Sequence, residues 1–317
     1  MKLLLPDHLA EALRAPIRQI APQSQIVTIS PSSAVDDSLE DVEVFFLHWG
    51  LDQEALQQLL RRMPNLRWLH TISAGVDHVP LPQLAASDVL LTNASGVFDT
   101  PVAEVVLAYM LSVVKRLPEM HQQQRARRWQ PQKLDELRGL TAGILCMGSI
   151  GVEVARLSRA FGMHVLGLQR HPRPHEHAEE VLPPERRCDL LRRSDFVVVA
   201  CPLTPETERL IGANELAAMK PTGWLINIAR GPLVDEEALI KALQQRQIGG
   251  ACLDVFTEEP LPEQSPLWDL PNVIITPHNA GSSPHTVERE VDLFQENLRR
   301  YVAGEPLLNV VDKRAGY

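Results

Sequence analysis

The chain of 317 residues contains 44% hydrophobic and 22% charged residues, so it has the composition of an ordinary globular protein and enough length for two cores. Its net charge of −9 argues against nucleic acid or an anionic membrane as the main partner. The four cysteines lack the paired spacing of a metal site, which favours free thiols in a reducing compartment.

The first 95 residues alternate between strand and helix patterns. Strands are predicted at Lys2–Leu5, Gln25–Ile29, Val42–Leu47, Leu66–Thr71 and Val89–Thr92. Helices are predicted at Asp7–Ala15 and Asp52–Arg62, each with an aspartate suited to cap its N-terminus. This alternation predicts a parallel sheet covered by helices. The apolar start before Pro6 is too short for a signal peptide, so we expect a cytoplasmic protein.

Two loops at strand ends in this region are candidates for binding an anionic ligand. One places Trp49 after the strand that ends at Leu47, and the other contains Ala74 and Gly75. Small residues let a ligand approach backbone N–H groups, which can hold a carboxylate without a side-chain charge. The alternative is two ordinary surface turns.

A crossing between two domains is predicted at residues 93–99, NASGVFD, because this stretch is rich in turn residues. Residues 100–117 then form a predicted helix that is apolar on most sides, which must be buried in a core or against a second subunit. Its apolar part is too short to span a bilayer. The polar and basic segment that follows is predicted to be solvated, with Trp129 as its anchor.

Residues 140–171 have the pattern of a nucleotide-binding unit: a strand, a glycine turn, a helix and a second strand. Gly148 and Gly151 lie in the turn, and the bare N–H groups of the following helix suit a pyrophosphate. The G-x-G-x-x-G fingerprint departs at its first glycine, where Cys146 fits if its backbone does not need a positive φ. A ligand-free βαβ unit with a tight turn is the alternative.

The end of the second strand in this unit bears on the choice of cofactor. NAD-binding units usually place Asp or Glu there to hold the ribose 2′-hydroxyl, whereas this chain has Gln169 followed by Arg170. The Arg170 guanidinium matches the geometry of a 2′-phosphate. The sequence therefore predicts NADP(H) as the preferred cofactor, with NAD(H) possible. The alternative is a solvated loop formed by Arg170 and His171.

The remaining chain continues the alternation, with strands predicted at Phe196–Ala200, Gly223–Ile228, Ala251–Val255 and Val273–Ile275. Asp235 is expected to cap a helix, and Ser283 and Pro284 to open a final one that ends near Ala303. His175 and His177 lack further ligands nearby, so we expect no metal.

Arg230, Glu259 and His278 each follow a separate one of these strands. If the strands are parallel, the three side chains share the edge of the sheet where α/β folds bind ligands. Arg230 would hold a substrate carboxylate and polarise the adjacent carbonyl, and His278 would give the carbonyl oxygen a proton as hydride arrives. Glu259 would hydrogen-bond His278 and fix its tautomer. Taken singly, each residue is as well explained by a salt bridge or a structural hydrogen bond.

Motifs across nearly the whole chain resemble the D-isomer-specific 2-hydroxyacid dehydrogenase family. The matching blocks are SAGVDHV (73–79), NASGVFDTPVAE (93–104), GILCMGSIG (143–151), CPLTPET (201–207), LINIARGPLVDEEAL (225–239), ACLDVFTEEPLP (251–262) and TPHNAG (276–281). Arg230, Glu259 and His278 fall on the family's catalytic positions. By the same resemblance Ala74 and Gly75 correspond to the loop that binds the substrate carboxylate, and the implied cofactor contacts are Ser149, Ile150, Cys201, Ile228, Ala229, Asp254 and Gly281.

The resemblance implies an α/β fold of two doubly wound parallel-sheet domains, Rossmann-like and flavodoxin-like, with a cleft between them. Residues 1–95 plus 286–317 would form the substrate-binding domain, and residues 96–285 the NAD(P)-binding domain. It also implies a homodimer paired through the cofactor domain, for which the helix at 100–117 and the arm after it are the candidates.

The predicted activity is that of an NAD(P)-dependent D-2-hydroxyacid dehydrogenase working mainly as a 2-ketoacid reductase. Glyoxylate and hydroxypyruvate are the leading substrates by resemblance, and a larger apolar acid such as phenylpyruvate is open because of the loop at Trp49. Two alternatives remain: a non-catalytic dinucleotide sensor that binds partner proteins, and a formate- or phosphite-type dehydrogenase of the same fold.

Overall fold

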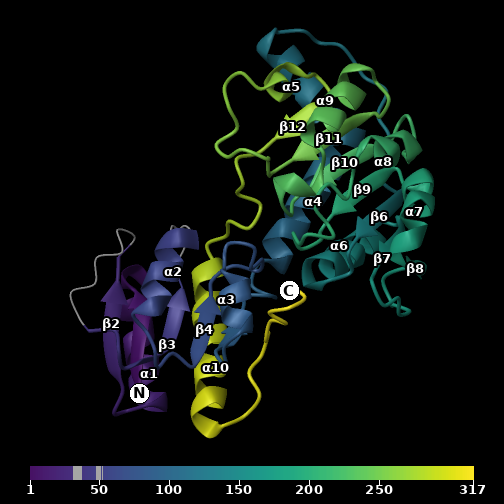
Figure 1. Ribbon diagram of the computed structural model, residues 1–317. Coiled ribbons are helices and arrows are strands. Elements are labelled where there is room, and N and C mark those ends of the chain that lie inside the picture. The colour runs from purple at the N-terminus through teal and green to yellow at the C-terminus, as the bar shows by residue number, and fades with distance from the viewer. Residues whose placement is uncertain (31–37, 48–50, 52) are drawn as a thin grey trace. The chain divides into compact units, whose positions relative to one another are not determined.

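The computed structural model describes residues 1–30, 38–47, 51 and 53–317, which fold as two compact units (Figure 1). The first unit combines Met1–Phe98 with Ser283–Tyr317, and the second is Asp99–Ser282. Trp49 and Asp52, to which the sequence assigned a ligand loop and a helix cap, lie outside the described residues.

The first unit is built on a five-stranded parallel sheet in the order β2-β1-β3-β4-β5. Its strands are β1 (Lys2–Pro6), β2 (Gln25–Ile29), β3 (Val42–Leu47), β4 (Trp68–Thr71) and β5 (Leu90–Thr92). Its helices are α1 (Asp7–Ile20), α2 (Gln53–Arg61), α3 (Leu81–Ala85) and α10 (Thr286–Ala303). The C-terminal helix α10 packs against α1, so the two ends of the chain share one core.

Helix α1 differs from its prediction at both ends. It continues past Ala15 and through Pro16 to Ile20, because Leu9, Leu13 and Ile17 keep one face buried. Pro6 occupies the capping position and no side chain caps the helix, so the cap predicted at Asp7 is wrong. Strand β1 runs directly into the helix, which places Asp7 inside the first turn, where its charge favours the helix dipole.

The second unit contains a seven-stranded parallel sheet in the order β12-β11-β10-β9-β6-β7-β8. Its strands are β6 (Thr141–Leu145), β7 (His164–Leu168), β8 (Glu180–Leu182), β9 (Phe196–Val199), β10 (Trp224–Asn227), β11 (Gly250–Leu253) and β12 (Val273–Ile275). The chain order reverses between β6 and β9, and open α/β sheets bind ligands at such a point. The predicted class, α/β with two doubly wound parallel sheets, is confirmed.

Helices and short 3-10 turns cover this second sheet (Figure 1). They are α4 (Asp99–Val114), α5 (Leu117–Arg125), α6 (Ser149–Ala160), η1 (Pro184–Arg186), α7 (Arg187–Arg193), α8 (Ala213–Ala218), η2 (Gly231–Leu233), α9 (Glu236–Gln244) and η3 (Pro266–Asp269). The apolar helix α4 packs against α6 and buries half of its 16 residues, as its composition indicates. The carboxylate of Asp235 accepts a hydrogen bond from the Ala238 N–H, which confirms the predicted cap of α9.

The arm after α4 is the part of this unit that sequence reasoning described least well. The segment from His121, predicted as solvated, begins inside the helix α5, which buries none of its residues and so shows no apolar period. Arg116 adopts a left-handed φ of 51° that separates α5 from α4. The predicted anchoring role of Trp129 is wrong, because its side chain is 97% exposed.

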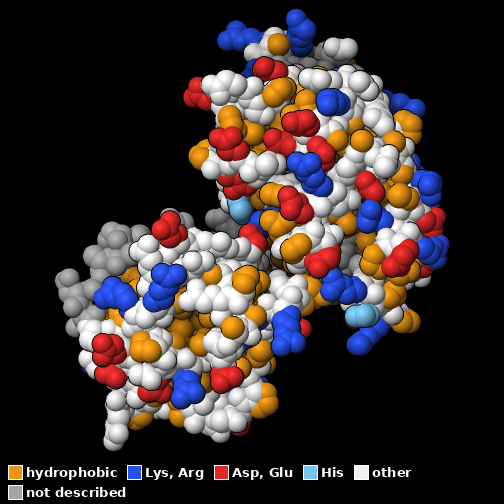
Figure 2. All heavy atoms as spheres, viewed as in Figure 1, with side chains coloured by type: hydrophobic (Ala, Val, Ile, Leu, Met, Phe, Trp, Pro, Cys, Tyr) orange, Lys and Arg blue, Asp and Glu red, His pale blue; other side chains and the backbone are white. Residues whose placement is uncertain are grey.

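The surface carries both signs of charge. Figure 2 shows acidic and basic side chains interspersed over the visible face of both units. Within the described parts of the chain, none of the helices combines the length and the hydropathy needed to cross a bilayer.

Candidate active site

The turn between β6 and α6 is shaped to admit a ligand. Gly148 precedes α6 in an extended conformation, and a Cβ added there would have no atom within 4 Å. A Cβ on Gly151 would instead lie 2.2 Å from the Cys146 carbonyl oxygen, so this glycine lets the helix approach the turn. Ser149 and Ile150 occupy the first turn of α6, whose N–H groups suit a phosphate.

Cys146 adopts a φ of 82°, so the condition under which a cysteine would fit this position without strain is not met. A non-glycine residue there costs roughly 1–2 kcal/mol. The N–H groups of Cys146 and Met147 both donate to the Leu168 carbonyl, at 3.1 Å each, and hold the turn against the end of β7. The turn therefore keeps the glycine conformation with a thiol on it.

Gln169 and Arg170 follow β7 beside this turn. The Gln169 N–H donates to the Leu182 carbonyl at 2.9 Å, which places its backbone between β7 and β8. Arg170 is exposed, and its charge acts on groups of two neighbouring loops, Cys146 and Glu206. The pKa of Glu206 is lowered first by a hydrogen bond from Thr204 and further by Arg170. The guanidinium thus lies over the edge of the sheet that carries the turn.

Cys201, Ile228 and Ala229 occupy the ends of β9 and β10 at the same edge. The Cys201 thiol donates to the Leu145 carbonyl at 3.2 Å and ties β9 to β6. Ile228 is buried, and the Ala229 N–H donates to the Asn227 side chain at 3.1 Å. These contacts give the loops a defined backbone.

Arg230 follows β10 and is held from both sides. Its backbone carbonyl accepts from the Asn227 amide at 2.9 Å, and its guanidinium donates to the Ala229 carbonyl at 2.8 Å. The next residue, Gly231, packs so tightly that a Cβ there would lie 2.0 Å from the Phe256 backbone. The loop of Arg230 therefore touches the loop that follows β11.

Glu259 joins that second loop to His278. Its two carboxylate oxygens contact different partners. Oε1 accepts from the Phe256 N–H at 2.9 Å, and Oε2 lies 2.6 Å from His278 Nδ1. When Glu259 accepts from Nδ1–H, the proton that His278 can exchange is on Nε2. The imidazole is half-exposed, with 46% of its side chain accessible.

Asp254 organises the loop that carries His278. The carboxylate is 1% exposed and accepts from the Asn279 N–H at 3.1 Å, the Ala280 N–H at 2.9 Å and the Thr276 hydroxyl. The Asp254 backbone carbonyl accepts from the His278 N–H at 2.8 Å. His278 itself has a left-handed φ of 48°, and this network holds it there.

The Tyr109 hydroxyl extends the network by a hydrogen bond to the Thr276 hydroxyl. Sequence reasoning missed both residues, because Tyr109 reads as one more apolar position of α4 and Thr276 as part of a turn. Only the fold brings α4 to the end of β12.

The structure brings Arg230, Glu259 and His278 onto adjoining loops at the edge that also carries the β6–α6 turn. Gly231, next to Arg230, packs against the Phe256 backbone, and Glu259 contacts both the Phe256 N–H and His278. Gly281 directly follows the loop held by Asp254. Among the described residues, no group of three or more His, Cys, Asp and Glu side chains is arranged to hold a metal ion.

Ala74 and Gly75 belong to the first unit, in the loop after β4. The Asn93 amide donates to the Ala74 carbonyl at 2.8 Å, and the Ser73 hydroxyl to the Gly75 carbonyl at 2.6 Å. Because both carbonyls accept hydrogen bonds, the backbone of this loop is held in place. His78, which sequence reasoning did not single out, adds a contact to Thr71 at 3.2 Å.

Comparison with known proteins places these features in a family. Residues 107–280 match the profile of a family described as D-isomer specific 2-hydroxyacid dehydrogenase, NAD binding domain. Glyoxylate/hydroxypyruvate reductase B of Serratia proteamaculans (strain 568) is 42% identical over 265 residues, which are 81% of each chain.

Two solved structures are similar over 100% of this chain and 99% of their own. One is a D-isomer specific 2-hydroxyacid dehydrogenase from Xanthobacter autotrophicus Py2 in complex with NADPH and MES, with a TM-score of 0.86 and 32% identity. The other is an NADPH-dependent glyoxylate/hydroxypyruvate reductase from Sinorhizobium meliloti in complex with NADP and sulfate, with a TM-score of 0.86 and 28% identity.

Proposed function

Because the chain belongs to the D-isomer specific 2-hydroxyacid dehydrogenase family, we propose that it reduces small 2-ketoacids, with glyoxylate and hydroxypyruvate first, to D-2-hydroxyacids at the expense of NADPH. The membership agrees with the motifs in the sequence. It makes the chain an NAD(P)-dependent 2-hydroxyacid dehydrogenase, and the choice of 2-ketoacid and of NADPH is the proposed part.

The observation that carries the proposal is the placement of Arg230, Glu259 and His278 on adjoining loops at one edge of the sheet, with Glu259 in contact with His278. The Arg230 guanidinium would bind the substrate carboxylate and polarise the adjacent carbonyl by charge-assisted hydrogen bonds. His278 would donate the Nε2 proton to the carbonyl oxygen during reduction and take it back in the reverse direction. Glu259, 2.6 Å from Nδ1, would keep the ring in the orientation that this transfer needs.

The residues at the β6–α6 turn fit a dinucleotide. The space beside Gly148 is open, the N-terminus of α6 offers N–H groups, and Arg170 adds a positive charge beside them. NADPH, when bound, supplies the hydride. We assign Gly148, Ser149, Ile150 and Gly151 to the pyrophosphate, Gln169 and Arg170 to the 2′-phosphorylated ribose, and Cys201, Ile228, Ala229, Asp254 and Gly281 to the wall of the site.

Substrate selectivity is assigned to the first unit. Ala74 and Gly75 would bind the substrate carboxylate through backbone N–H groups. We assign residues 1–95 plus 286–317 to the substrate-binding domain and 96–285 to the NAD(P)-binding domain. A cytoplasmic location stays a prediction.

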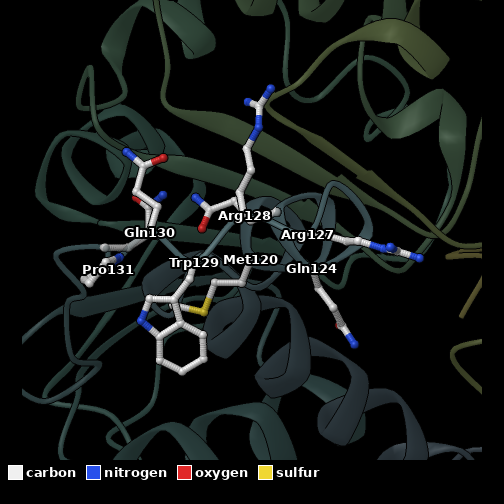
Figure 3. Close-up of a pocket in the computed structure, with 9 residues that line it drawn as sticks. Met120, Gln124, Arg127, Arg128, Trp129, Gln130 and Pro131 are labelled. Carbon is white, nitrogen blue, oxygen red and sulfur yellow. The ribbon is translucent and has the colours of Figure 1, made fainter.

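The arm after α4, which contains α5 and Trp129, suggests where a second copy would dock. Trp129 is almost fully exposed, and an open hollow of about 650 Å³ is lined by it and by Met120 (Figure 3). Figure 3 shows Arg127 and Arg128 pointing away from the indole, which leaves its face uncovered. We propose that the enzyme is a homodimer that buries this arm.

A reductase assay tests the proposal. The consumption of NADPH and of NADH would be followed with glyoxylate, hydroxypyruvate, pyruvate and phenylpyruvate, for the parent enzyme and for Arg230→Ala. We expect turnover by the parent, at least about 100-fold lower kcat/KM in the variant, as when one anion-stabilising donor is removed, and unchanged NADPH affinity.

The assay also separates the rival readings. Near-parental turnover by Arg230→Ala would contradict the role given to Arg230. Binding of NADPH without turnover on any ketoacid would favour a dinucleotide sensor over an enzyme. A parallel assay with NADP⁺ or NAD⁺ tests the third reading, because nucleotide reduction by formate or phosphite alone would replace the substrate class.

A further inference from the structure

Two cysteines meet at the point where the order of the second sheet reverses. Strands β6 and β9 pair with Leu145 opposite Val199. Cys146 directly follows Leu145, and Cys201 lies two residues after Val199. The Leu145 carbonyl accepts from both the Ala200 N–H at 3.0 Å and the Cys201 thiol at 3.2 Å. The Cys201 sulfur therefore lies against the peptide that leads into Cys146.

Each of the two thiols shifts the pKa of the other, and the two shifts have opposite directions. The pKa of Cys146 is lowered chiefly by the neighbouring Cys201 thiol, while burial opposes this and the Gly148 N–H and the Arg170 charge add to it. The pKa of Cys201 is raised well above its usual value by the same contact and by burial. The half-buried Cys146 is therefore the more acidic of the two thiols, and the buried Cys201 is the less acidic.

This asymmetry is that of an oxidisable cysteine beside a resolving cysteine. The other two free cysteines offer a contrast. Cys252 is fully buried in β11, where burial raises its pKa, and Cys188 lies on α7. Neither of these two has another of the four free cysteines beside it in the way that Cys146 has Cys201.

We propose that Cys146 and Cys201 are a modification site that a peroxide converts to a disulfide, and that this closes the dinucleotide turn. The Cys146 thiolate attacks one oxygen of hydrogen peroxide, the O–O bond breaks, and hydroxide leaves and is protonated to water. The Cys201 sulfur then attacks the sulfur of the sulfenic acid, the S–O bond breaks, and a second water leaves with the Cys201 proton. Two thiols lose two electrons in total, and the peroxide gains them.

The turn transmits this change to the cofactor site. The Cys146 carbonyl lies so close to Gly151 that a Cβ there would be at 2.2 Å, so drawing Cys146 toward Cys201 displaces the start of α6. The effect on activity rests on the proposed function, because it requires that this turn bind NADPH. Bound NADPH would cover the turn and slow the oxidation.

The test uses the full-length enzyme with hydrogen peroxide. Peptide mass spectrometry without reductant should find Cys146 linked to Cys201 with the loss of two hydrogens, and NADPH present during oxidation should suppress the link. NADPH affinity, measured by the fluorescence of the bound nucleotide, should fall about tenfold or more and return with dithiothreitol. Cys188→Ser and Cys252→Ala should respond like the parent.

Cys201→Ser separates the two thiols. In this variant Cys146 should accumulate as a sulfenic acid that dimedone traps, and prolonged peroxide should cause a loss of NADPH binding that dithiothreitol does not reverse. Absence of the link in the oxidised parent, or absence of a dimedone adduct on Cys146 in oxidised Cys201→Ser, would overturn the proposed pair. A link that leaves NADPH affinity unchanged would overturn its effect on the turn. If the Cys146–Cys201 disulfide forms but the protein never binds NADPH, the proposed function is overturned and the proposed disulfide pair is supported.

Discussion

Arg170 is the residue that sets the cofactor preference in our proposal. A carboxylate at this strand end would hold the 2′-hydroxyl of NAD and repel a 2′-phosphate, and this chain has an amide and a guanidinium instead. Its charge reaches the neighbouring Cys146 and Glu206, so it lies over the edge where the dinucleotide would bind.

Arg170→Asp should therefore make this position disfavour NADPH relative to NADH. Loss of a charge-assisted hydrogen bond, worth about 1.5–3 kcal/mol, predicts that the ratio of kcat/KM with NADPH to kcat/KM with NADH falls roughly 10- to 150-fold. Steady-state kinetics with both nucleotides measure the ratio. Arg192→Asp makes the same charge change on the exposed end of α7 and should leave the ratio as in the parent. An unchanged ratio in Arg170→Asp would assign the preference elsewhere.

At the scale of elements, the loop after β12 that carries His278 depends on a helix distant in sequence. Helix α4 contributes the Tyr109 hydroxyl to Thr276, and Thr276 donates to the Asp254 carboxylate that holds the backbone around His278. A positioning residue can thus act on His278 without touching substrate.

Tyr109→Phe keeps the aromatic ring and removes only the hydroxyl. Loss of one hydrogen bond of about 0.5–1.5 kcal/mol predicts a kcat lowered roughly 2- to 12-fold, with NADPH affinity unchanged, because the His278 loop is less well ordered. Tyr301→Phe, on α10 in the other unit, is the matched control. Equal kcat for Tyr109→Phe and the parent would show that the loop holds His278 without Tyr109.

Helix α10 carries a buried carboxyl group that makes stability depend on pH. Glu290 is 3% exposed, and burial raises its pKa to about 7. The pKa in the folded state thus exceeds that in the unfolded chain, about 4.3, so the folded state is favoured most at low pH and loses stability as the pH rises through 7.

Glu290→Gln stays neutral and should remove this dependence. Thermal unfolding should show the variant melting above the parent at about pH 8 and close to it at about pH 4.5. Glu288→Gln changes an exposed carboxylate on the same helix and should shift neither comparison. The same difference at both pH values would mean that Glu290 does not titrate in the folded protein.

At the scale of the whole molecule, the exposed arm points to assembly. Trp129 is 97% exposed, and such a side chain is unusual on a lone globular protein but common at the centre of an interface.

Trp129→Glu should convert the proposed dimer to a monomer, because a charge buried at an interface without a partner opposes association. Sedimentation velocity of parent and variant at equal concentration measures this. Trp268→Glu replaces another exposed tryptophan of the same unit, 51% accessible, and should leave the mass unchanged. A monomeric parent would refute the dimer, and a dimeric Trp129→Glu would move the interface away from the arm.

The sequence by itself determined the architecture and named the chemical groups that we propose for the site. Short runs rich in β-branched and other apolar residues mark strands, so β2, β3 and β12 lie where their patterns predicted. Short motifs after strands name Arg230, Glu259 and His278 as candidates. Where the signal is local, as at the Asp235 cap of α9, the sequence was sufficient to predict the structure.

Only the tertiary structure decided what depends on contacts between distant segments. The length of α1 follows from burial of Ile17, and α5 has no buried face to reveal it in sequence. The left-handed backbone of Cys146 is imposed by its hydrogen bond to the end of β7, and the link from Tyr109 to Asp254 exists because the fold packs α4 beside the loop after β12. Periodicity records which faces are buried, and it does not record the partner that buries them.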